Sequence, residues 1–575
     1  MIKPSEQKPW LKFFSEEALN ATLPHKTIYE YMTDFNREHP DDYAISFYGN
    51  RITYGQLLST VEETAASFAA LGVKKDTGVC CLSATIPELV FSLYGLNKLG
   101  AVMFSLDPRR GIDEIRGTIR ESGAKVMIVL DLALSKIEPL IRECGIEKVI
   151  VISVDNYMPG WARLVKQLKE PSPKVSYSDT VISWKKFLTL GRGRTTELVP
   201  FDPEQVVAVT MTGGTTGKPK GVMLTNDGFN AIALSFEHCG VPHERGQRFL
   251  GIVPAFASYG LVASLHMPLS LGLELVIFPR VLDTKVPKII RKYRPEHTLM
   301  VPTYYERLMN SREMRHNFDL SFLRTAGSGG DTMNTGLETK VNAFLKQHGS
   351  PYPISQGYGM SEVSSAASCC CAGNFKSMSI GYPLLTHVIG VFRPNTTEEL
   401  GYGEVGELCI TGPAVMKGYF NNPEETAHVL RRHEDDQVWV HSGDLGYMDE
   451  EGFLFIIGRI KRAIVRADGH KVFPVNIEDV LSAHDDVTNC AVVGVRDRNH
   501  TQGQFPVAFV TLKEGTDPTK CRDELLKLAT DKIEARSFPQ DIVVINELPL
   551  VGMGKIDYAR LTREYEDEHF DKLCV

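Results

Sequence analysis

The chain of 575 residues lacks any uninterrupted apolar segment close to the ~20 residues that cross a bilayer. Its first residues, Met1-Ile-Lys-Pro-Ser-Glu-Gln-Lys-Pro9, lack the apolar core of a signal peptide. Cysteine stands second from the C-terminus, whereas prenylation requires it fourth. There is no long basic run, and the net charge is −8. We therefore expect a cytoplasmic protein without a transmembrane segment, a polybasic membrane contact or a nucleic-acid partner.

Paired cysteine motifs are also missing. The 11 cysteines are an odd number, and no two of them form a C-x-x-C pair. Cys369-Cys-Cys371 are contiguous, which suits neither a zinc knuckle nor a disulfide framework. We expect all of them to be reduced thiols of the core or of loops, as in a reducing cytoplasm.

Length and pattern indicate a layered α/β protein. Single cores rarely exceed ~250–300 residues, so two or more domains are expected. A leading segment, 1–27, precedes a helix that begins at Ile28, and a hairpin follows with Gly49-Asn50 in its turn. Predicted helices at 57–71 and 86–99 alternate with predicted strands at 79–82, 101–105, 126–130 and 148–152. This alternation favours parallel βαβ layers.

The rhythm changes further along the chain. Residues 155–200 are polar and irregular, and we interpret them as a surface excursion; the β/α rhythm then runs from 206 to about 365. Residues 386–457 show short strands and many turns, which predicts a small antiparallel or barrel-like part. We therefore predict a large N-terminal α/β domain, 1–460, of layered βαβ sheets with this β-barrel-like part. A smaller, mobile α+β domain, 461–575, completes the chain.

One glycine-rich stretch carries the strongest chemical signal. A predicted strand, Val206–Thr210, leads into Thr210-Met-Thr-Gly-Gly-Thr-Thr-Gly-Lys-Pro-Lys-Gly221. Glycines bring backbone N–H groups close to a ligand, hydroxyls donate hydrogen bonds, and lysines add positive charge. The stretch is not a P-loop, because Thr212 occupies the first glycine position and Pro219 follows Lys218. It predicts a polyphosphate site, the alternative being an ordinary surface loop; the candidate residues are Thr212, Gly213, Gly214, Thr215, Thr216, Gly217, Lys218 and Lys220.

Several ordered motifs together resemble one family. The glycine-rich stretch resembles the phosphate loop of the adenylate-forming superfamily, which contains acyl-CoA synthetases, adenylation domains and beetle luciferases. The other matching motifs, in family order, are Thr53-Tyr-Gly-Gln-Leu57, Leu96–Pro108, Gln356-Gly-Tyr-Gly-Met-Ser-Glu362, Ser442-Gly-Asp444, Gly458-Arg-Ile-Lys461 and Pro549-Leu-Val-Gly-Met-Gly-Lys555. The resemblance spans residues 50 to 560 and implies an ATP-dependent enzyme.

The resemblance implies a nucleotide site with assigned roles. Glu362 would hold Mg²⁺, which favours one or two carboxylates together with phosphate oxygens. Asp444 would accept both ribose hydroxyls, since a carboxylate offers acceptor sites only. The residues implied for adenine or AMP are Gly329, Gly330, Asp331, Gln356, Gly357, Tyr358, Gly359, Ser361, Asp444 and Arg459.

The C-terminal motifs imply a moving lid. Lys461 matches the family's hinge, and Gly469 falls in a glycine loop that would line the CoA tunnel, although this loop is about one residue longer here. Lys555 matches the catalytic lysine, while Val551 replaces the family's usual threonine. A lysine between carboxylate and α-phosphate would stabilise the attack of one anion on another.

The acyl pocket is less sharply defined. No aspartate occurs from Ala255 to Leu265, so a substrate ammonium group would lack a buried partner there. Ala257 falls where many CoA synthetases have histidine, which leaves room for a bulkier acid, or else reflects ordinary helix packing. The implied pocket residues are Phe256, Ala257, Tyr259, Tyr304 and Ser328. A mostly apolar wall favours a hydrophobic acid without an α-amino group.

We therefore expect an AMP-forming acid–thiol ligase that uses ATP, Mg²⁺ and CoA. One alternative is an adenylating enzyme that loads a separate carrier protein, and a weaker one is a luciferase-like oxygenase. A non-catalytic binding relative is a further alternative, which intact Lys555, Glu362 and Asp444 argue against.

Overall fold

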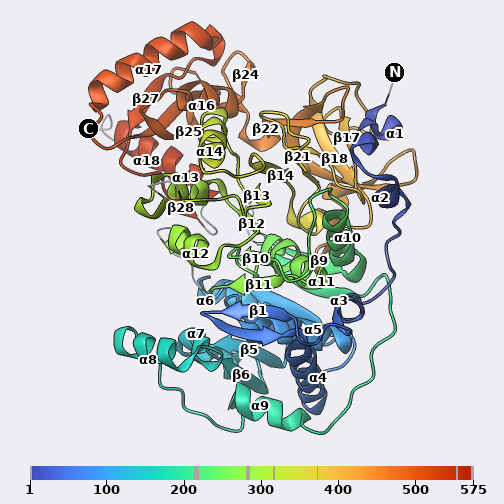
Figure 1. The fold of residues 1–575 in the computed structure, drawn as a ribbon. Helices are drawn as coiled ribbons and strands as arrows, with labels where there is room; N and C mark the ends of the chain where they lie inside the picture. The colour runs from blue at the N-terminus through green and yellow to red at the C-terminus, as the bar shows by residue number, and fades with distance from the viewer. Residues whose placement is uncertain are drawn as a thin grey trace.

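The computed structural model describes residues 3–212, 219–279, 285–314, 318–371, 373–500, 502–551 and 555–570. Figure 1 shows a blue-to-teal sheet at the bottom, a green sheet above it, an orange sheet at the upper right and a red domain at the upper left. This arrangement confirms the predicted α/β fold with a large N-terminal part and a smaller C-terminal one. None of the helices within the described ranges is long and apolar enough to span a membrane.

The first sheet has eight strands in the order β19-β9-β8-β4-β3-β5-β6-β7. Its strands are β3 (Gly78–Leu82), β4 (Val102–Leu106), β5 (Val126–Leu130), β6 (Lys148–Ile152), β7 (Val181–Ser183), β8 (Val206–Met211), β9 (Gly221–Thr225) and β19 (Gly418–Tyr419). The strands from β8 to β7 pair in parallel, whereas β9 is antiparallel to both β8 and β19. All residues of β4 and β5 are buried, as expected for parallel strands covered on both faces.

The second sheet has nine strands in the order β16-β15-β14-β13-β12-β10-β11-β1-β2. These are β1 (Tyr43–Phe47), β2 (Asn50–Thr53), β10 (Arg248–Gly251), β11 (Glu274–Ile277), β12 (His297–Met300), β13 (Thr325–Ser328), β14 (Ser355–Tyr358), β15 (Ser368–Cys369) and β16 (Tyr382–Pro383). β1 and the strands from β11 to β14 are parallel, so their carboxyl ends lie at one edge of the sheet.

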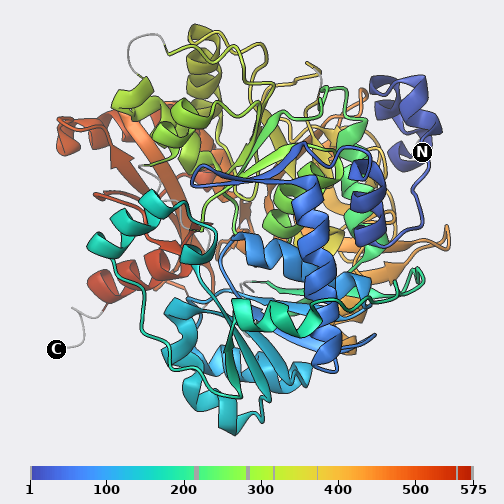
Figure 2. The same cartoon turned by 60° about the horizontal axis from the view of Figure 1, so that its bottom comes forward.

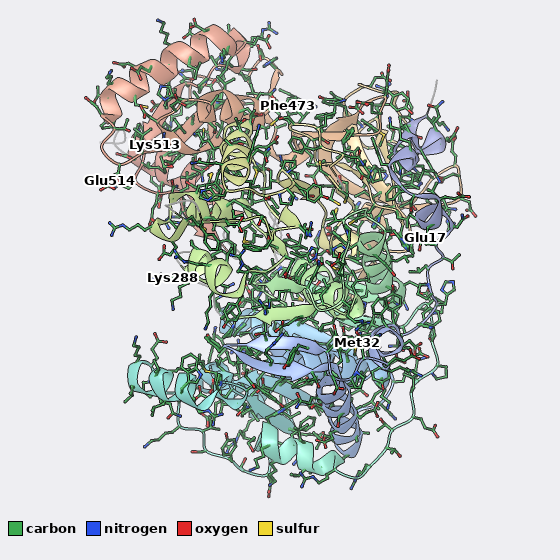
Figure 3. All side chains as sticks on the ribbon, in the orientation of Figure 1. Glu17, Met32, Lys288, Phe473, Lys513 and Glu514 are labelled. Carbon is green, nitrogen blue, oxygen red and sulfur yellow. The ribbon has the colours of Figure 1, made fainter. Side chains whose placement is uncertain are left out.

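Helices complete the two sheets. They are α3 (Ile28–Asn36), α4 (Tyr54–Ala70), α5 (Pro87–Lys98), α6 (Ile112–Ser122), α7 (Asp131–Glu143), α10 (Asn226–Glu237), α11 (Met267–Ser270), α12 (Val286–Tyr293), α13 (Pro302–Asn310) and α14 (Thr335–Gln347). Every residue of α5 is buried. Met32 of α3, labelled in Figure 3, belongs to the same large core.

Local signals near the N-terminus agree with the sequence predictions, with one small difference. Thr27 caps α3, and Glu30 closes a capping box with it. In the β1–β2 hairpin the turn residues are Tyr48 and Gly49, not Gly49 and Asn50, and both have positive φ. This matches the preference of two-residue hairpins for turns with φ above zero.

The prediction of an irregular surface excursion at residues 155–200 is wrong. This segment forms α8 (Gly160–Lys169), β7 and α9 (Trp184–Gly191). Trp184 and Phe187 of α9 are buried and pack in the core, so the segment is part of the domain. Its polar composition concealed the structure, because few of its residues face inward.

The predicted small antiparallel part is present. It consists of β17 (Val388–Phe392), β18 (Gly406–Thr411), β20 (Leu430–Arg432), β21 (Val438–Met448) and β22 (Leu454–Arg459), all paired antiparallel, with α15 (Pro423–Val429) beside it. A register shift between β18 and β21 leaves three residues of β21, 442–444, opposite a single residue of β18. The strand therefore bulges, and Asp444 lies in the bulge.

The C-terminal part has its own small core. It contains the hairpin β23 (Ile464–Val465) and β24 (Lys471–Val472), the sheet β25 (Val487–Arg496), β26 (Gln504–Leu512) and β27 (Asp541–Val544), and the pair β28 (Leu550–Val551) and β29 (Lys555–Ile556). Its helices are α16 (Pro474–Ser482), α17 (Pro518–Lys532) and α18 (Tyr558–Phe570). The predicted boundary between residues 460 and 461 falls within the short helix η7 (Ile460–Arg462) and stays a prediction.

Polar contacts join this part to the rest of the chain. Asn334 Nδ2 donates to Ser482 Oγ over 3.1 Å, and Lys340 Nζ donates to the carbonyl of Val487 over 3.4 Å. The first bond joins the N-cap residue of α14 to the last residue of α16, and the second joins α14 to the first residue of β25. Polar interfaces of this kind are typical of domains that move relative to one another.

Candidate active site

The predicted nucleotide residues follow the carboxyl ends of strands. β8 ends at Met211 just before Thr212, β13 ends at Ser328 before Gly329, and β14 ends at Tyr358 before Gly359. In open α/β sheets, ligands bind outside the carboxyl ends of the strands. Within the second sheet, the register pairs Ser328 with Gln356, so the β13 and β14 motifs are neighbours.

Three predicted residues meet around the Asp444 carboxylate. Tyr358 Oη donates a hydrogen bond of 2.7 Å to Asp444 Oδ2, and Arg459 Nε lies 2.9 Å from Asp444 Oδ1. Asp444 is buried, whereas half of the Arg459 side chain is exposed. Burial and the nearby Asp444 carboxylate raise the pKa of Tyr358, and Asp444 raises the pKa of Arg459. A carboxylate offers about four acceptor sites, so both ribose hydroxyls can still bind.

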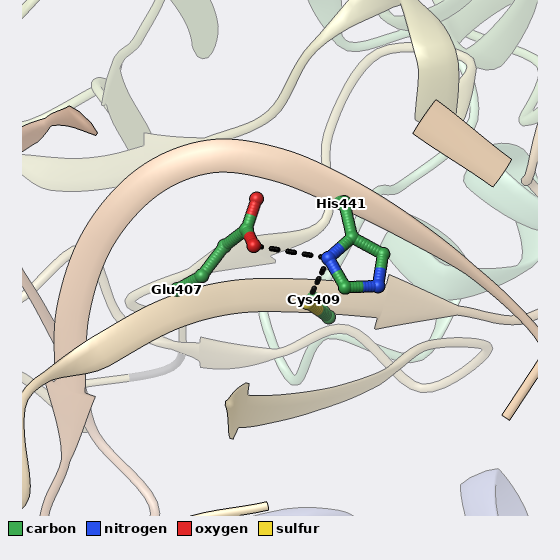
Figure 4. A group of neighbouring side chains, drawn as sticks. All are labelled: Glu407, Cys409 and His441. Atoms are coloured by element: carbon green, nitrogen blue, oxygen red, sulfur yellow. Dashed lines mark hydrogen bonds and ion pairs between the residues drawn. The ribbon is translucent and has the colours of Figure 1, made fainter. Parts of the chain in front are cut away.

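A buried glutamate supports the bulge that presents Asp444. Glu407 Oε1 accepts a hydrogen bond of 2.9 Å from Gly443 N, and Oε2 accepts one of 2.9 Å from His441 Nδ1 (Figure 4). Ser442 Oγ donates to the Leu408 carbonyl over 2.6 Å. The bulge is therefore attached to β18 at three consecutive residues immediately before Asp444. Sequence reasoning missed Glu407, because its role depends on pairing between strands.

Glu407, Cys409 and His441 also have the donor types of a metal site. Their ligand atoms all lie within 4.8 Å of one another, and all three residues are buried. Both Glu407 oxygens already accept hydrogen bonds, and His441 Nε2 lies 3.0 Å from His433 Nε2. Hydrogen bonds therefore account for the group without an ion.

Glu362, the residue predicted to hold Mg²⁺, is linked to the base of the phosphate loop. Tyr419 Oη donates to Glu362 Oε1 over 2.7 Å, and Lys220 Nζ lies 5.0 Å from the Tyr419 ring centroid while pairing with Glu425. Within the described residues, Glu362 Oε2 accepts no hydrogen bond. One carboxylate oxygen fixed by a hydroxyl and one without such a partner suit a Mg²⁺ ligand.

Only the two ends of the predicted phosphate loop can be placed. Thr212 N donates to the Lys220 carbonyl over 2.9 Å, which closes the base of the β8–β9 connection. Gly213, Gly214, Thr215, Thr216, Gly217 and Lys218 lie outside the described residues.

A cavity of about 160 Å³ extends from the nucleotide motifs into the large domain. Among the predicted residues it is lined by Ala257, Tyr259, Ser328, Gly329, Gly330, Gly357, Tyr358, Gly359 and Ser361. The apolar residues Phe236, Val241 and Leu299 form part of the cavity wall. The exposed Arg324 also borders the cavity. None of the described lining residues is Asp or Glu. A cavity of similar size, ~150 Å³, is known to hold a benzene molecule.

The helix that contributes Tyr259 and Ala263 to the cavity wall has unusual geometry. Residues Tyr259–His266 form a π-helix, a form often found at functional sites. Ser258 Oγ, just before it, donates to Ser361 Oγ over 2.9 Å. A Cβ on Gly260 would lie 2.1 Å from the Pro254 carbonyl oxygen, so glycine is required for this close approach.

Other predicted residues lie beside the cavity instead of lining it. The Phe256 ring lies 5.4 Å from the Arg109 guanidinium, and Tyr304 packs at the edge of a neighbouring core cluster. Gln356 is buried, and its Nε2 donates to Glu338 on α14. The Gln356 side chain therefore points away from the cavity, which its neighbours Ser355 and Gly357 line.

Four cysteines line the cavity, which the sequence analysis did not anticipate. Cys369, Cys370 and Cys371 form one wall, and Cys239 from the end of α10 joins them. The Sγ atoms of Cys369 and Cys371 lie 2.8 Å apart, and burial raises the pKa of Cys370 to about 12. The prediction of core or loop thiols holds for their burial, but nothing in the sequence indicated that they share a cavity.

His243 borders the same cavity as an uncharged ring. Its ring stacks on His297 with centroids 4.6 Å apart, and burial lowers the pKa of His243 to about 4. His243 therefore adds no charge to the cavity wall near pH 7.

Of the two C-terminal motifs, the one around Lys555 lies at the interface with the large domain, whereas the Gly469 loop does not line a cavity. A second cavity, of about 50 Å³, is lined by Thr303 and Asp331 of the large domain and by Ile556 and Tyr558 of the small one. Lys555 immediately precedes Ile556 on β29, so its backbone lies at this interface. Gly469 instead lies exposed in the β23–β24 turn with φ of +82°, and it lines neither cavity.

The predicted hinge, Lys461, lies between β22 and β23 in the chain. Lys461 is exposed in η7. The next residue, Arg462, is held by side chains of the small domain. Arg462 donates to Glu478 Oε1 over 3.0 Å, and its guanidinium lies 3.7 Å from the Tyr558 ring centroid. The small domain is therefore anchored directly after Lys461.

Comparison with known proteins agrees with this geometry. The family model described as AMP-binding enzyme matches residues 32–420, and the model of the AMP-binding enzyme C-terminal domain matches residues 476–555. The chain belongs to the AMP-binding enzyme family.

Relatives cover nearly the whole chain. The chain is 32% identical to a long-chain-fatty-acid–CoA ligase of Bacillus subtilis (strain 168), over 98% of this chain and all of that protein. It is 28% identical to 4-coumarate-CoA ligase 1 of Narcissus pseudonarcissus, covering 89% of this chain and 88% of the relative.

Solved structures share the fold. An anthranilate CoA ligase in complex with anthranoyl-AMP superposes with a TM-score of 0.82 at 22% identity, covering 96% of this chain and 99% of the other. ATP-bound MatB from Rhodopseudomonas palustris gives 0.80 at 20% identity, covering 95% and 100%. The comparisons confirm the predicted family and fold, and they agree with an ATP-dependent, AMP-forming acid–thiol ligase. The carrier-loading and oxygenase alternatives gain no support from them.

Proposed function

We propose that this enzyme converts a hydrophobic carboxylic acid without an α-amino group into its CoA thioester at the expense of ATP. The observation that carries the proposal is the largely apolar cavity. Its lining includes Ser361, Gly329 and Tyr358, the last of which is hydrogen-bonded to Asp444, and none of its described lining residues is acidic. An acid seated there has its carboxylate at the nucleotide end and its tail among apolar side chains.

In the first step the acid's carboxylate oxygen attacks the α-phosphorus of ATP, and pyrophosphate leaves. Asp444 and Tyr358 hold the ribose end, and Thr212 and Lys220 with the intervening loop bind the phosphates. Lys555, carried on β29, neutralises charge between the two reacting anions. The interface position of Ile556 beside Asp331 supports this role for Lys555.

Glu362 fits a Mg²⁺ ligand, because Tyr419 orients one of its oxygens and leaves the other without a protein hydrogen-bond donor among the described residues. When bound, Mg²⁺ would neutralise phosphate charge. Tyr419 and Lys220 then keep Glu362 and the loop base at a fixed separation.

In the second step the thiol of CoA loses its proton to solvent, its sulfur attacks the acyl carbonyl, and AMP leaves. We propose that the small domain first turns about Lys461, because Gly469 lies away from both cavities in the present arrangement. The turn would withdraw Lys555 and bring the β23–β24 hairpin to the acyl-adenylate.

A pyrophosphate-release screen tests this function. Purified protein is given ATP, Mg²⁺ and acids of increasing chain length, aryl acids and α-amino acids, with and without CoA. We expect release with hydrophobic acids and a CoA thioester in the product. The same assay with a phosphopantetheinylated carrier protein in place of CoA distinguishes the acceptor. No release with any acid would support a non-catalytic relative instead.

A further inference from the structure

Helix α8 presents its apolar side chains to solvent. Trp161, Leu164, Val165 and Leu168 are exposed by 63%, 61%, 47% and 79%. Their spacing of i, i+3, i+4 and i+7 places them on one face of the helix. Ala162 is its one buried residue. Scattered exposed apolar residues are ordinary, but a continuous stripe of this kind indicates a binding surface.

The polar side of α8 is the side that holds it to the protein. Lys166 Nζ lies 2.8 Å from Asp155 Oδ1 and donates to Ser172 Oγ over 2.6 Å. Arg163 donates to the Met158 carbonyl over 3.3 Å. The helix is thus oriented opposite to an ordinary surface helix, with charged groups inward and the apolar stripe outward. Figure 1 shows α8 projecting at the lower left of the molecule, and Figure 2 views the same teal helix from below.

Basic side chains flank the stripe. Residues 159–169 contain no acidic residue, and of their three basic residues Lys169 is exposed, whereas Arg163 and Lys166 face inward. Lys292 of α12 lies with its Nζ 5.9 Å from the Trp161 ring centroid, and within the described residues it forms no ion pair. Figure 3 labels Lys288, also on α12, on the side from which α8 projects. Lys288, Arg291, Lys292 and Arg294 are all exposed on or beside α12.

Some acidic groups lie in the same region. Lys288 pairs with Glu313 at 3.4 Å, and Arg294 pairs with Asp319 at 3.3 Å. Glu170 follows the last residue of α8. The cation that directly borders the apolar stripe is Lys292, so the charge next to Trp161 is positive.

We propose that α8 and α12 form a docking surface for a lipid bilayer that carries anionic headgroups. The α8 stripe enters the boundary between headgroups and acyl chains, and the α12 cations meet lipid phosphates. Tryptophan suits this boundary because its ring is apolar and its N–H is polar. A stripe of four side chains is far smaller than the ~1,000 Å² of a stable protein interface, which favours a bilayer over a protein partner.

This inference does not depend on the proposed reaction. It concerns a peripheral contact, since none of the described helices can span a membrane. It also differs from the expectation drawn from composition, which found no polybasic run. The surface combines two helices that lie more than 100 residues apart in the chain.

Vesicle flotation provides the first test. The purified full chain is mixed with vesicles of phosphatidylcholine alone or of phosphatidylcholine with phosphatidylglycerol. We expect flotation with the mixed vesicles, decreasing as salt is raised. The double variant Leu164→Glu/Leu168→Glu should lose binding by about tenfold or more. Lys288→Glu/Lys292→Glu should lose binding to the anionic vesicles.

Intrinsic fluorescence reports the same contact at one site. The chain has four tryptophans, and Trp10, Trp184 and Trp439 are at most 3% exposed. Emission that shifts to shorter wavelength on adding vesicles therefore reports Trp161. The shift should disappear in the Leu164→Glu/Leu168→Glu variant.

The control is Leu19→Glu on α2 (Glu16–Asn20), which is 48% exposed and lies on the opposite side of the molecule in Figure 1. It should float like the parent, and all variants should keep the parent's unfolding midpoint. Failure of the parent to float, or equal flotation of the α8 variant, would overturn the proposal. A dimer that dissociates in the α8 variant would also overturn it, because the stripe would then join two copies.

Discussion

His441 Nδ1 donates a 2.9 Å hydrogen bond to Glu407 Oε2, and together the two residues brace the bulge that carries Asp444. The other Glu407 oxygen holds Gly443 N, one residue before Asp444. The position of the Asp444 carboxylate, which is predicted to bind the ribose, therefore depends on a buried residue of the neighbouring strand.

Replacing this support should weaken ATP binding. In Glu407→Ala, Gly443 N–H and His441 Nδ1–H lose their acceptor, at a cost of roughly 1–3 kcal/mol. We expect the KM for ATP in pyrophosphate release to rise about tenfold, with a smaller change in kcat. Glu407→Gln keeps an acceptor for Gly443 and should retain most of the affinity. An unchanged KM for ATP in Glu407→Ala would contradict the bracing role.

Lys555 should matter for one half-reaction only. Lys555→Ala should lower acyl-adenylate formation by about 10²–10³, the usual effect of removing one transition-state donor. Thioester formation from a supplied acyl-adenylate and CoA should persist. The matched control is Lys527→Ala, at an exposed position of α17, which should alter neither half-reaction. Equal loss of both half-reactions would remove Lys555 from this role.

The hinge can be tested by fixing its backbone. Lys461→Pro locks φ near −65° and should hinder the turn of the small domain. We expect adenylation to continue, while CoA thioester formation decreases strongly in single-turnover assays. Lys461→Ala leaves the backbone free and should support both steps. If the proline variant forms thioester at the parent's rate, residue 461 is not the pivot.

The depth of the cavity should set the acid that is accepted. Ala263 lines it from the π-helix, and Ala263→Leu would add three carbon atoms to the wall. We expect kcat/KM for long-chain acids to fall by tenfold or more, about 1.4 kcal/mol, while short acids are less affected. Ala263→Ser adds a single atom and should keep the parent's preference. An unchanged chain-length profile in the leucine variant would place the acyl tail elsewhere.

Buried histidines predict an acid-sensitive fold. Burial lowers the pKa of His266 to about 3 and of His387 to about 4, as it does for His243. The folded state keeps these rings neutral, whereas the unfolded chain binds protons below about pH 6.5. Stability is therefore full above about pH 6.5 and falls as the pH drops toward 4, by about 1.4 kcal/mol per unit for each ring.

Urea unfolding at a series of pH values checks this. His387→Gln removes one titrating ring and should make the decrease in unfolding free energy shallower between about pH 6.5 and 4. His39→Gln, at an exposed position, is the control. A His387→Gln variant with the parent's slope would show that this ring does not contribute.

The agreement between sequence and structure is greatest where the chemistry is local. The start of α3 after Thr27, the alternation of helices and strands and the parallel pairing of β3 to β6 all follow from residues close together in the chain. Tyr358 and Asp444 were assigned through ordered motifs, and the structure joins them by a hydrogen bond. The roles of Glu362 and Lys555 stay predictions.

The roles of residues that act through partners distant in the chain could not be predicted from the sequence. Glu407 acts through a residue of the neighbouring strand, and Cys239 shares a cavity wall with Cys369–Cys371, which lie more than 100 residues further along the chain. Gln356 was assigned to AMP, yet its side chain turns to Glu338 on α14. A motif fixes the order of residues along the backbone but not which face each side chain takes.

The sequence alone determined the family and the alternation of strands and helices, and it predicted the residues of a nucleotide site, because these depend on residue type and short spacing. Tertiary structure decided which buried groups brace Asp444 and which residues line the apolar cavity. It also decided that α8 turns its apolar stripe outward. The spacing of Trp161, Leu164, Val165 and Leu168 permits such a stripe, but its direction is fixed by the tertiary contacts of the opposite face, among them the ion pair of Lys166 with Asp155.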